Sequence, residues 1–265
     1  MKHIIVGMLA ETFVHPGTGQ NVGAIDLPVA REAATSYPFV AGSSLKGALR
    51  QAFEDKEGKE AAKAIFGEQD NAGNVLIADA RLLLLPVRSL SSAYKWLTCP
   101  HLLERLQRDL KRSGDDSEFE LPKVEKKTVC SQGSGRLFLE ERSFEIADKP
   151  SETLVNALKQ LIPNGTTAGR LNEQLAILSD DDFAWFARYG LAVQARNQLT
   201  DKKTSNNLWY EETLPPDTLM YAVLAERNGK GALQDVRKIG DYLQVGGNET
   251  VGQGWFSLRW PEAGE

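Results

Sequence analysis

The sequence predicts an α+β fold with a ferredoxin-like or RRM-like palm of order βαββαβ. Two apolar runs, residues 2–13 and 75–85, have the composition of buried strands and enclose a segment with helical periodicity. Residues 218–226 and 242–260 repeat this arrangement around a second helical segment. Two βαβ halves of this kind make the ferredoxin-like pattern, which modules that bind single-stranded RNA also use.

One domain accounts for the whole chain, because 265 residues are enough to bury a sizeable core. We expect the palm in residues 1–90 and 216–265, and a large helical insertion with fingers and a thumb hairpin in residues 91–215. No apolar run is long enough to cross a membrane, and Cys99 and Cys130 lack metal-type spacing. We therefore expect a cytoplasmic protein without zinc.

The overall charge argues mildly against a nucleic-acid binder. The net charge is −5, whereas such proteins usually carry a basic surface. The charges are unevenly distributed, however, since acidic and basic runs are separate along the chain. The lysine pairs are candidates for a local basic track, so nucleic-acid binding stays open.

The loop before the first helix holds a candidate catalytic carboxylate. Asp26 stands between the apolar residues Ile25 and Leu27, which restrict its movement. A catalytic or metal-binding carboxylate needs such a fixed position. A turn-capping aspartate gives the same pattern. His15, in the turn-rich segment 14–23, has the pattern of an ordinary surface residue.

The first helical segment carries a candidate anion site. Ser43 or Ser44 can cap the helix, because a hydroxyl oxygen accepts a hydrogen bond from a first-turn amide. Apolar side chains recur at helical spacing through residue 53, and Lys46 and Arg50 lie four residues apart on one side. A helix N-terminus beside two cations suits a phosphate group. A surface helix with solvated cations is the alternative.

The other elements follow from periodicity and turn residues. Asp79 and Arg81 lie two apart in the strand at 75–85, which places them on one face. We expect helices at residues 59–66, 101–112, 151–161, 182–193 and 231–239, a strand pair at 136–146, and a polar insertion or mobile loop at 113–135.

A polar arm lies near the end of the insertion. Residues 201–207 contain Lys202 and Lys203 beside hydroxyl and amide side chains, between Leu199 and Leu208. This composition is typical of a hairpin tip or flexible arm. A surface loop without a functional role is the alternative.

A glycine-rich loop precedes the last strand. Its glycines permit backbone conformations that other residues disfavour, and they let a ligand come close. Such a loop is not specific alone, but its position between two strands near the C-terminus fits a binding site.

Two motifs together resemble the RAMP superfamily of CRISPR-associated proteins. They are Gly-Ser-Ser-Leu-Lys-Gly-Ala-Leu-Arg at residues 42–50 and Gly-Gly-Asn-Glu-Thr-Val-Gly-Gln-Gly-Trp at residues 246–255. Three further stretches, at residues 24–28, 96–100 and 208–215, resemble the repeated backbone subunit of type III-B (Cmr) effector complexes. The resemblance spans nearly the whole chain.

The resemblance implies a hand-shaped subunit that stacks in several copies along a guide (CRISPR) RNA, beside other type III-B effector subunits. The helix and glycine loop would grip guide phosphates, and the arm would be a thumb that interrupts pairing between guide and target. Base pairing would read the sequence. The implied RNA-binding residues are Ser43, Ser44, Lys46, Arg50, Lys202, Lys203, Gly246, Gly247, Asn248, Gly252 and Gly254.

The resemblance also implies an endoribonuclease that cleaves single-stranded target RNA at regular intervals. Asp26 matches the family's catalytic carboxylate, and His15, Glu211 and Glu212 fall near secondary candidates. Asp26 would hold a divalent metal, Mg²⁺ or Mn²⁺, or accept the proton of a 2′-hydroxyl. One carboxylate makes a poor metal cage, so phosphate oxygens and water would complete a transient site.

Three alternatives stay open. A scaffold of the same fold would coat guide RNA while cleavage occurs elsewhere. An endoribonuclease that processes guide precursors would need a general acid–base pair, and the chain has only three histidines. An enzyme acting on a phosphorylated metabolite would use Lys46 and the glycine loop to bind a small phosphate ligand.

Overall fold

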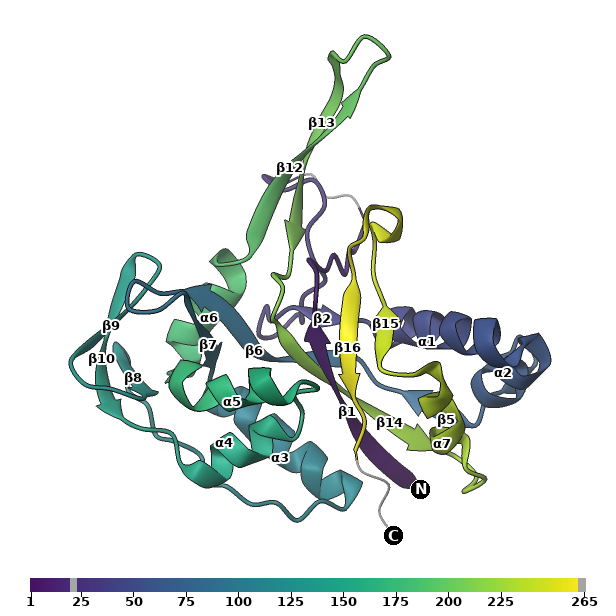
Figure 1. The fold of residues 1–265 in the computed structure, drawn as a ribbon, viewed down its shortest axis with the longest axis horizontal. Coiled ribbons are helices and arrows are strands. Elements are labelled where there is room, and N and C mark those ends of the chain that lie inside the picture. The colour runs from purple at the N-terminus through teal and green to yellow at the C-terminus, as the bar shows by residue number, and fades with distance from the viewer. Residues whose placement is uncertain (20–22, 262–265) are drawn as a thin grey trace.

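A twelve-stranded mixed sheet forms the body of the protein (Figure 1). The computed structural model describes residues 1–19 and 23–261, so part of the loop expected at 14–23 lies outside the described residues. The strands run in the order β15-β16-β1-β14-β6-β7-β11-β8-β10-β9, with β2 and β5 pairing at the sides. The prediction of a mixed α and β protein is confirmed.

The palm half of the sheet is antiparallel throughout. Its strands are β1 (Lys2–Ala10), β2 (Phe39–Val40), β5 (Val75–Ile77), β6 (Ala80–Arg88), β14 (Leu219–Glu226), β15 (Tyr242–Gln244) and β16 (Trp255–Arg259). β14 lies at the centre between β1 and β6, and all its residues are buried. This explains why its sequence is almost continuously apolar.

Side chains of β14 alternate between two cores, one on each face of the sheet. Met220 and Leu224 pack with apolar residues of α1 and α7, whereas Tyr221 and Val223 pack with those of α3, α4 and α5. The central palm strands are therefore covered on both faces. In the described structure, the central strands of the palm present no open sheet face to a ligand.

Seven helices are described around the sheet (Figure 1). They are α1 (Gly42–Glu57), α2 (Lys59–Phe66), α3 (Pro100–Ser113), α4 (Glu152–Lys159), α5 (Gly165–Gln174), α6 (Asp180–Tyr189) and α7 (Ala232–Val236). α3 shows why such segments are helical. It starts with a proline in the first turn and ends at Gly114, whose positive φ of 83° lets its amide bond the last carbonyls. Within the described residues, no helix has the length and apolar character needed to cross a membrane.

The insertion extends the palm sheet. Its strands are β7 (Tyr94–Thr98), β8 (Thr128–Ser131), β9 (Arg136–Leu139), β10 (Arg142–Asp148) and β11 (Leu175–Leu178). The predicted strand pair at 136–146 is confirmed. The prediction of a loop for 113–135 is wrong in part, because β8 lies there and buries Val129 and Cys130, while Phe119 joins the second core. α5 and β11 were missed.

A separate hairpin, the arm, projects from the body (Figure 1). It consists of β12 (Ala192–Leu199) and β13 (Ser205–Thr213). The predicted helix at 182–193 ends earlier, at Tyr189, since Gly190 follows and β12 begins two residues later.

Two other predicted elements are shorter than expected. The helix at 231–239 divides into α7 and a 3₁₀ turn at Arg237–Ile239. The strand at 75–85 is interrupted between β5 and β6, so Asp79 and Arg81 do not share the face of one continuous strand. A small hairpin of β3 (Gly67–Glu68) and β4 (Asn71–Ala72) follows α2.

Candidate active site

Asp26 lies against the base of the arm. Its Oδ2 accepts a hydrogen bond of 2.8 Å from the backbone amide of Tyr210. The amide of Leu27 donates to the Tyr210 carbonyl at 3.1 Å, and that of Glu212 donates to the Leu27 carbonyl at 3.0 Å. These bonds pair the loop with β13. Asp26 is nevertheless exposed, so its carboxylate is both positioned and accessible.

Glu212 anchors the loop on the other side of this pairing. It is buried, and its Oε1 accepts a hydrogen bond of 2.7 Å from Arg31. Its Oε2 accepts one of 3.1 Å from the Val29 amide. Both oxygens are therefore occupied within the protein.

Glu211 contacts a different set of side chains from Glu212. Its side chain is 1% exposed, and its Oε2 lies 3.3 Å from Arg196 Nε. The Asn248 amide group donates to its Oε1, and His15 Nδ1 lies 3.6 Å from the same oxygen. Glu211 thus joins the arm, the glycine loop and the segment after β1.

His15 is not the surface residue that its loop position indicated. It is 7% exposed, and its Nδ1 lies 2.8 Å from the Glu212 carbonyl oxygen. A ring nitrogen at this distance from a carbonyl donates the hydrogen bond, so Nδ1 carries the proton. His15 is buried because Gly17 and Gly247 lie against its ring, while Gly246 lies against its carbonyl group.

The structure thus brings the four predicted catalytic candidates together. Asp26 is accessible, whereas Glu211, Glu212 and His15 are buried and already paired. The accessible carboxylate is the group suited to contact a substrate. The buried groups hold the surrounding segments.

The described residues do not form a metal site by themselves. Among them, no group of three or more His, Cys, Asp or Glu side chains could hold a metal ion. Arg31 and Arg196 already neutralise the two glutamates. Of the three candidate carboxylates, Asp26 is the accessible one, whereas Glu211 and Glu212 are buried.

The glycine loop packs closely against the same site. Gly246 has a φ of 105°, and a Cβ there would lie 2.8 Å from the His15 carbonyl oxygen. Gly254 has a φ of 86°, and its Cβ would lie 2.4 Å from the Val245 carbonyl oxygen. These glycines let the chain approach itself. Their contacts with RNA, and those of Gly247 and Gly252, stay predictions.

Asn248 also faces the protein. It has a φ of 64°, and its side-chain amide donates to Glu211 and, at 3.0 Å, to Gln253. This side chain therefore supports a buried carboxylate, and its predicted contact with RNA has to come from other atoms of the residue.

The N-terminus of α1 is capped differently from the prediction. Ala41 is the N-cap, and no serine caps the helix. Instead Asp79 Oδ1 accepts a hydrogen bond of 2.6 Å from the Gly42 amide. Ser43 and Ser44 lie exposed in the first turn. The carboxylate already places negative charge at this helix end, where an anion was expected.

Lys46 and Arg50 differ in their surroundings. Arg50 Nη1 donates to the Gly67 carbonyl at 3.0 Å, and its Nε lies 4.0 Å from Glu54. Lys46 is half-buried and makes no hydrogen bond or ion pair within the described structure. Lys46 is therefore the better candidate for a phosphate contact.

The two lysines of the arm lie apart from this helix. Lys202 and Lys203 are exposed at the arm tip, where Lys203 has a φ of 59°. The arm projects away from α1 (Figure 1). The predicted RNA-binding residues therefore form separate patches.

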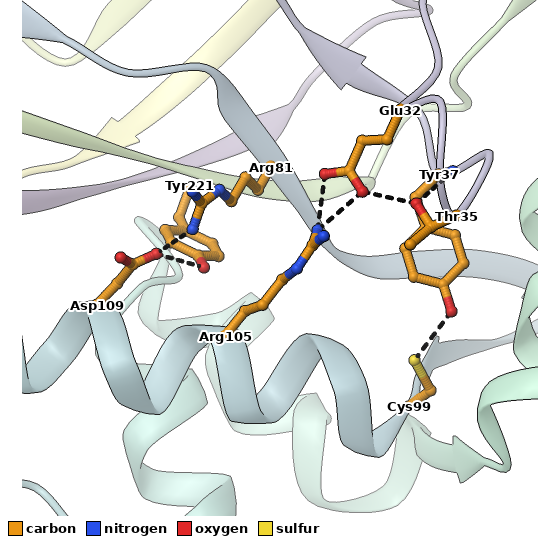
Figure 2. Close-up of polar contacts among 8 residues, drawn as sticks. All are labelled: Glu32, Thr35, Tyr37, Arg81, Cys99, Arg105, Asp109 and Tyr221. Atoms are coloured by element: carbon orange, nitrogen blue, oxygen red, sulfur yellow. Dashed lines mark hydrogen bonds and ion pairs between the residues drawn. The ribbon is translucent and has the colours of Figure 1, made fainter.

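A polar network fixes the loop after Asp26 to α3 (Figure 2). Arg105 Nη1 bonds both carboxylate oxygens of Glu32, at 2.7 and 2.9 Å, and Thr35 donates to Glu32 at 2.6 Å. Burial opposes ionisation of Glu32, but these hydrogen bonds outweigh it and lower its pKa. The loop is thereby held by a charged carboxylate.

Neither cysteine is a nucleophile in this fold. Burial raises the pKa of Cys99 and of Cys130 to about 12, so both stay protonated near neutral pH. Tyr37 lies 3.6 Å from the Cys99 sulfur (Figure 2).

Sequence reasoning missed Arg31, Arg196 and Gln253. Single polar residues in polar segments carry no motif, and their partners are distant in the chain. Only the folded arrangement shows that they bond Glu212, Glu211 and Asn248, respectively.

The fold and site together define a mixed α and β protein with a projecting hairpin, a glycine loop and an accessible carboxylate where the two meet. Residues 8–257 match the RAMP superfamily, and the chain belongs to this superfamily. The resemblance in its motifs is thus confirmed.

Its relatives include two curated proteins. It is 34% identical to the CRISPR system Cmr endoribonuclease Cmr4 of Pyrococcus furiosus, over 99% of this chain and 97% of that protein. It is 24% identical to the CRISPR system CMR subunit Cmr4 of Saccharolobus solfataricus, over 95% and 94%.

Solved structures are similar over the full length. The crystal structure of oligomeric Cmr4 from Pyrococcus furiosus matches with a TM-score of 0.80 and 30% identity, covering 100% of both chains. A chain of the type III-B Cmr-β complex bound to cognate target RNA matches with a TM-score of 0.80 and 23% identity, over 98% of this chain and 97% of that chain. The second similarity concerns the fold alone.

Proposed function

We propose that the chain is a repeated backbone subunit of a type III-B CRISPR ribonucleoprotein, which binds guide RNA and cleaves the complementary target RNA. Asp26 is its catalytic carboxylate. The observation that carries this assignment is the accessible Asp26 carboxylate, held by the Tyr210 amide at the base of the arm. The 34% identity to a Cmr endoribonuclease supports the reaction.

The palm of this subunit is ferredoxin-like. The antiparallel order β16-β1-β14-β6, with α1 after β1 and α7 after β14, supports this description. Residues 1–90 and 216–265 make the palm, and residues 91–215 the insertion, whose β12–β13 hairpin is the thumb.

Its partners are guide RNA, single-stranded target RNA, copies of itself and other effector subunits, in the cytoplasm. A relative at 30% identity is described as oligomeric, which supports stacking of copies. The arm, projecting from one end of the body, is suited to reach a neighbouring copy or the RNA between copies (Figure 1).

The chemistry assigned to Asp26 is proton removal. Its free oxygen accepts the proton of a target 2′-hydroxyl, and the 2′-oxygen attacks the adjacent phosphorus. The bond from phosphorus to the 5′-oxygen breaks, and the leaving 5′-oxygen takes a proton from water. The products are a 2′,3′-cyclic phosphate and a 5′-hydroxyl. Much of the rate comes from alignment of the displaced nucleotide.

The alternative role of Asp26 is to hold a divalent cation, Mg²⁺ or Mn²⁺, as a transient partner in place of accepting the proton. The chain supplies Asp26 alone, and RNA phosphate oxygens and water would supply the other ligands. Such a cation would stabilise negative charge on the phosphate.

The test is Asp26→Asn in the assembled complex. The asparagine oxygen can still accept the Tyr210 amide, while the charge is lost. We expect normal assembly and target binding and a loss of about 10²- to 10⁴-fold in cleavage rate. Asp70→Asn, in the exposed turn between β3 and β4, is the control.

Wild-type cleavage by Asp26→Asn would favour the scaffold alternative. The guide-processing alternative is disfavoured by His15, because it is buried and its Nδ1 is already bonded.

A further inference from the structure

Arg31 connects three segments that meet at the candidate active site. Its Nη1 donates to the carbonyl oxygens of Ser36 at 2.8 Å and of Ala187 at 2.7 Å. Its Nη2 donates to Glu212 Oε1 at 2.7 Å. One guanidinium thus joins its own loop, the C-terminal end of α6 and the body end of β13.

The contact with α6 determines where the arm leaves the body. The last carbonyls of a helix have no partner within it, and the helix dipole makes that end negative, so an arginine is favourable there. α6 ends at Tyr189, and β12 begins at Ala192. Arg31 therefore holds the first strand of the arm at its origin.

The contact with Glu212 determines where the loop lies on the second strand. The Glu212 side chain is 5% exposed and the Arg31 side chain is 20% exposed. The same carboxylate accepts the Val29 amide, three residues after Asp26. Loss of Arg31 would leave a buried carboxylate without this cation, which is unfavourable and would displace Glu212 or the loop.

We propose that Arg31 is a positioning residue. It holds the loop that carries Asp26 at one fixed position along the arm, so that target RNA is cut at a single phosphodiester. It acts through Glu212, whose amide bonds Leu27 beside Asp26. This inference rests on the proposed function.

A purely stabilising ion pair would behave differently, and the chain offers a matched control. Arg81 and Asp109 form a pair of 2.6 Å between β6 and α3, with the Asp109 side chain 7% exposed (Figure 2). Among the described residues, this pair forms no hydrogen bond or ion pair with Asp26 or the arm. Arg81→Gln therefore measures the effect of losing a similar buried pair elsewhere.

The experiment uses the complex assembled with guide RNA. Arg31→Gln, Arg31→Lys, the double variant Arg31→Gln/Glu212→Gln, Arg81→Gln and Asp26→Asn are compared. The measurements are single-turnover cleavage at saturating target, target affinity, the positions of product ends, and hydrogen exchange of the Leu27, Tyr210 and Glu212 amides.

Arg31→Gln should cleave about 10- to 100-fold more slowly, since a misplaced reactive group loses its alignment. Its target affinity should stay within about threefold, its product ends should spread over neighbouring positions, and the three amides should exchange faster. The double variant has no unpaired buried charge, so it should regain stability. It should still cleave slowly and at several positions, because the bonds from Arg31 to Ser36 and Ala187 are lost. Arg31→Lys should be intermediate, because lysine lacks the planar fork of arginine.

Cleavage by Arg31→Gln at the rate and positions of Arg81→Gln would overturn the inference. If Arg31→Gln does not assemble, the same comparison is made with the double variant and Arg31→Lys. Wild-type cleavage by both would overturn the inference. Wild-type cleavage by Asp26→Asn would instead overturn the proposed function, so the two failures are distinguishable.

Discussion

The amide of Tyr210 donates a hydrogen bond of 2.8 Å to Asp26 Oδ2, so the arm and the candidate catalytic carboxylate share a direct contact. Tyr210 belongs to β13 and its side chain is 46% exposed. A shift of the arm therefore moves the group that orients Asp26. If Asp26 is the proposed catalytic carboxylate, we expect cleavage to depend on the position of the arm.

Replacing residues 201–207 with a short Gly-Ser turn should leave the fold intact and alter the cleavage pattern. The replaced side chains are all exposed, so the core loses nothing. The arm, however, is proposed to displace the nucleotide at the scissile step. Thermal unfolding and the ladder of target fragments test both parts. The variant Lys202→Ser/Lys203→Ser, which keeps the arm length, is the control. A normal ladder from the shortened arm would contradict its role as a thumb.

Lys46→Ala and Arg50→Ala should differ, the first in RNA binding and the second in stability. Lys46→Ala should weaken guide RNA binding independently of sequence and lower the salt slope by about one unit. Arg50→Ala should mainly destabilise the fold, by about 1 kcal/mol, because it loses the bond to Gly67. Binding at several salt concentrations and denaturant unfolding separate the two. Lys63→Ala, whose partner is Glu60, is the control. Unchanged affinity and slope in Lys46→Ala would leave α1 as an ordinary surface helix.

Local patterns predicted the elements whose burial is regular. The apolar run of β14 and the helical spacing of apolar residues in α1 and α2 could be predicted, because each depends on residues that are close in sequence. α5 was missed because Leu171 is its only buried residue, so it has almost no apolar periodicity. β11 is a four-residue apolar run, which periodicity alone does not assign.

The candidate site could be predicted only in part, because its contacts join residues that are distant in sequence. Asp26 was identified by its resemblance to a family motif, and its loop position alone favoured a turn cap. The partners that decide its geometry lie far away in the chain, as with Tyr210, 184 residues later. Asp79 capping Gly42 is a similar long-range contact, 37 residues apart. No spacing rule connects such positions.

Glu32→Gln should lower stability at neutral pH and have little effect in acid. The pKa of Glu32 is lowered in the folded state, since the hydrogen bonds from Arg105 and Thr35 outweigh burial. A carboxyl with a lowered folded pKa stabilises the protein above its unfolded pKa, and this contribution is lost as the pH falls through the folded value. The melting temperatures of wild type and variant should therefore differ at pH 7 and converge in acid, as the pH falls through the lowered folded pKa of Glu32. Glu57→Gln, at the exposed end of α1, is the control. A constant gap across this range would contradict the role of the charge.

Gly254→Ala should cost more stability than Gly252→Ala, although both glycines have positive φ angles, 86° and 79°. An L-residue in this conformation costs about 1–2 kcal/mol at either position. At Gly252 an added Cβ meets nothing within 4 Å, whereas at Gly254 it would lie 2.4 Å from the Val245 carbonyl oxygen. That backbone has little freedom, because the Val245 amide bonds Gly254 at 2.9 Å and the Gly254 amide bonds Phe13 at 2.8 Å. The clash should add about 1–3 kcal/mol to the loss at Gly254, as in other overpacked sites. Denaturant unfolding of both variants measures the difference. Equal losses would mean that the loop yields, and that its close approach to the Val245 backbone is not what requires a glycine at position 254.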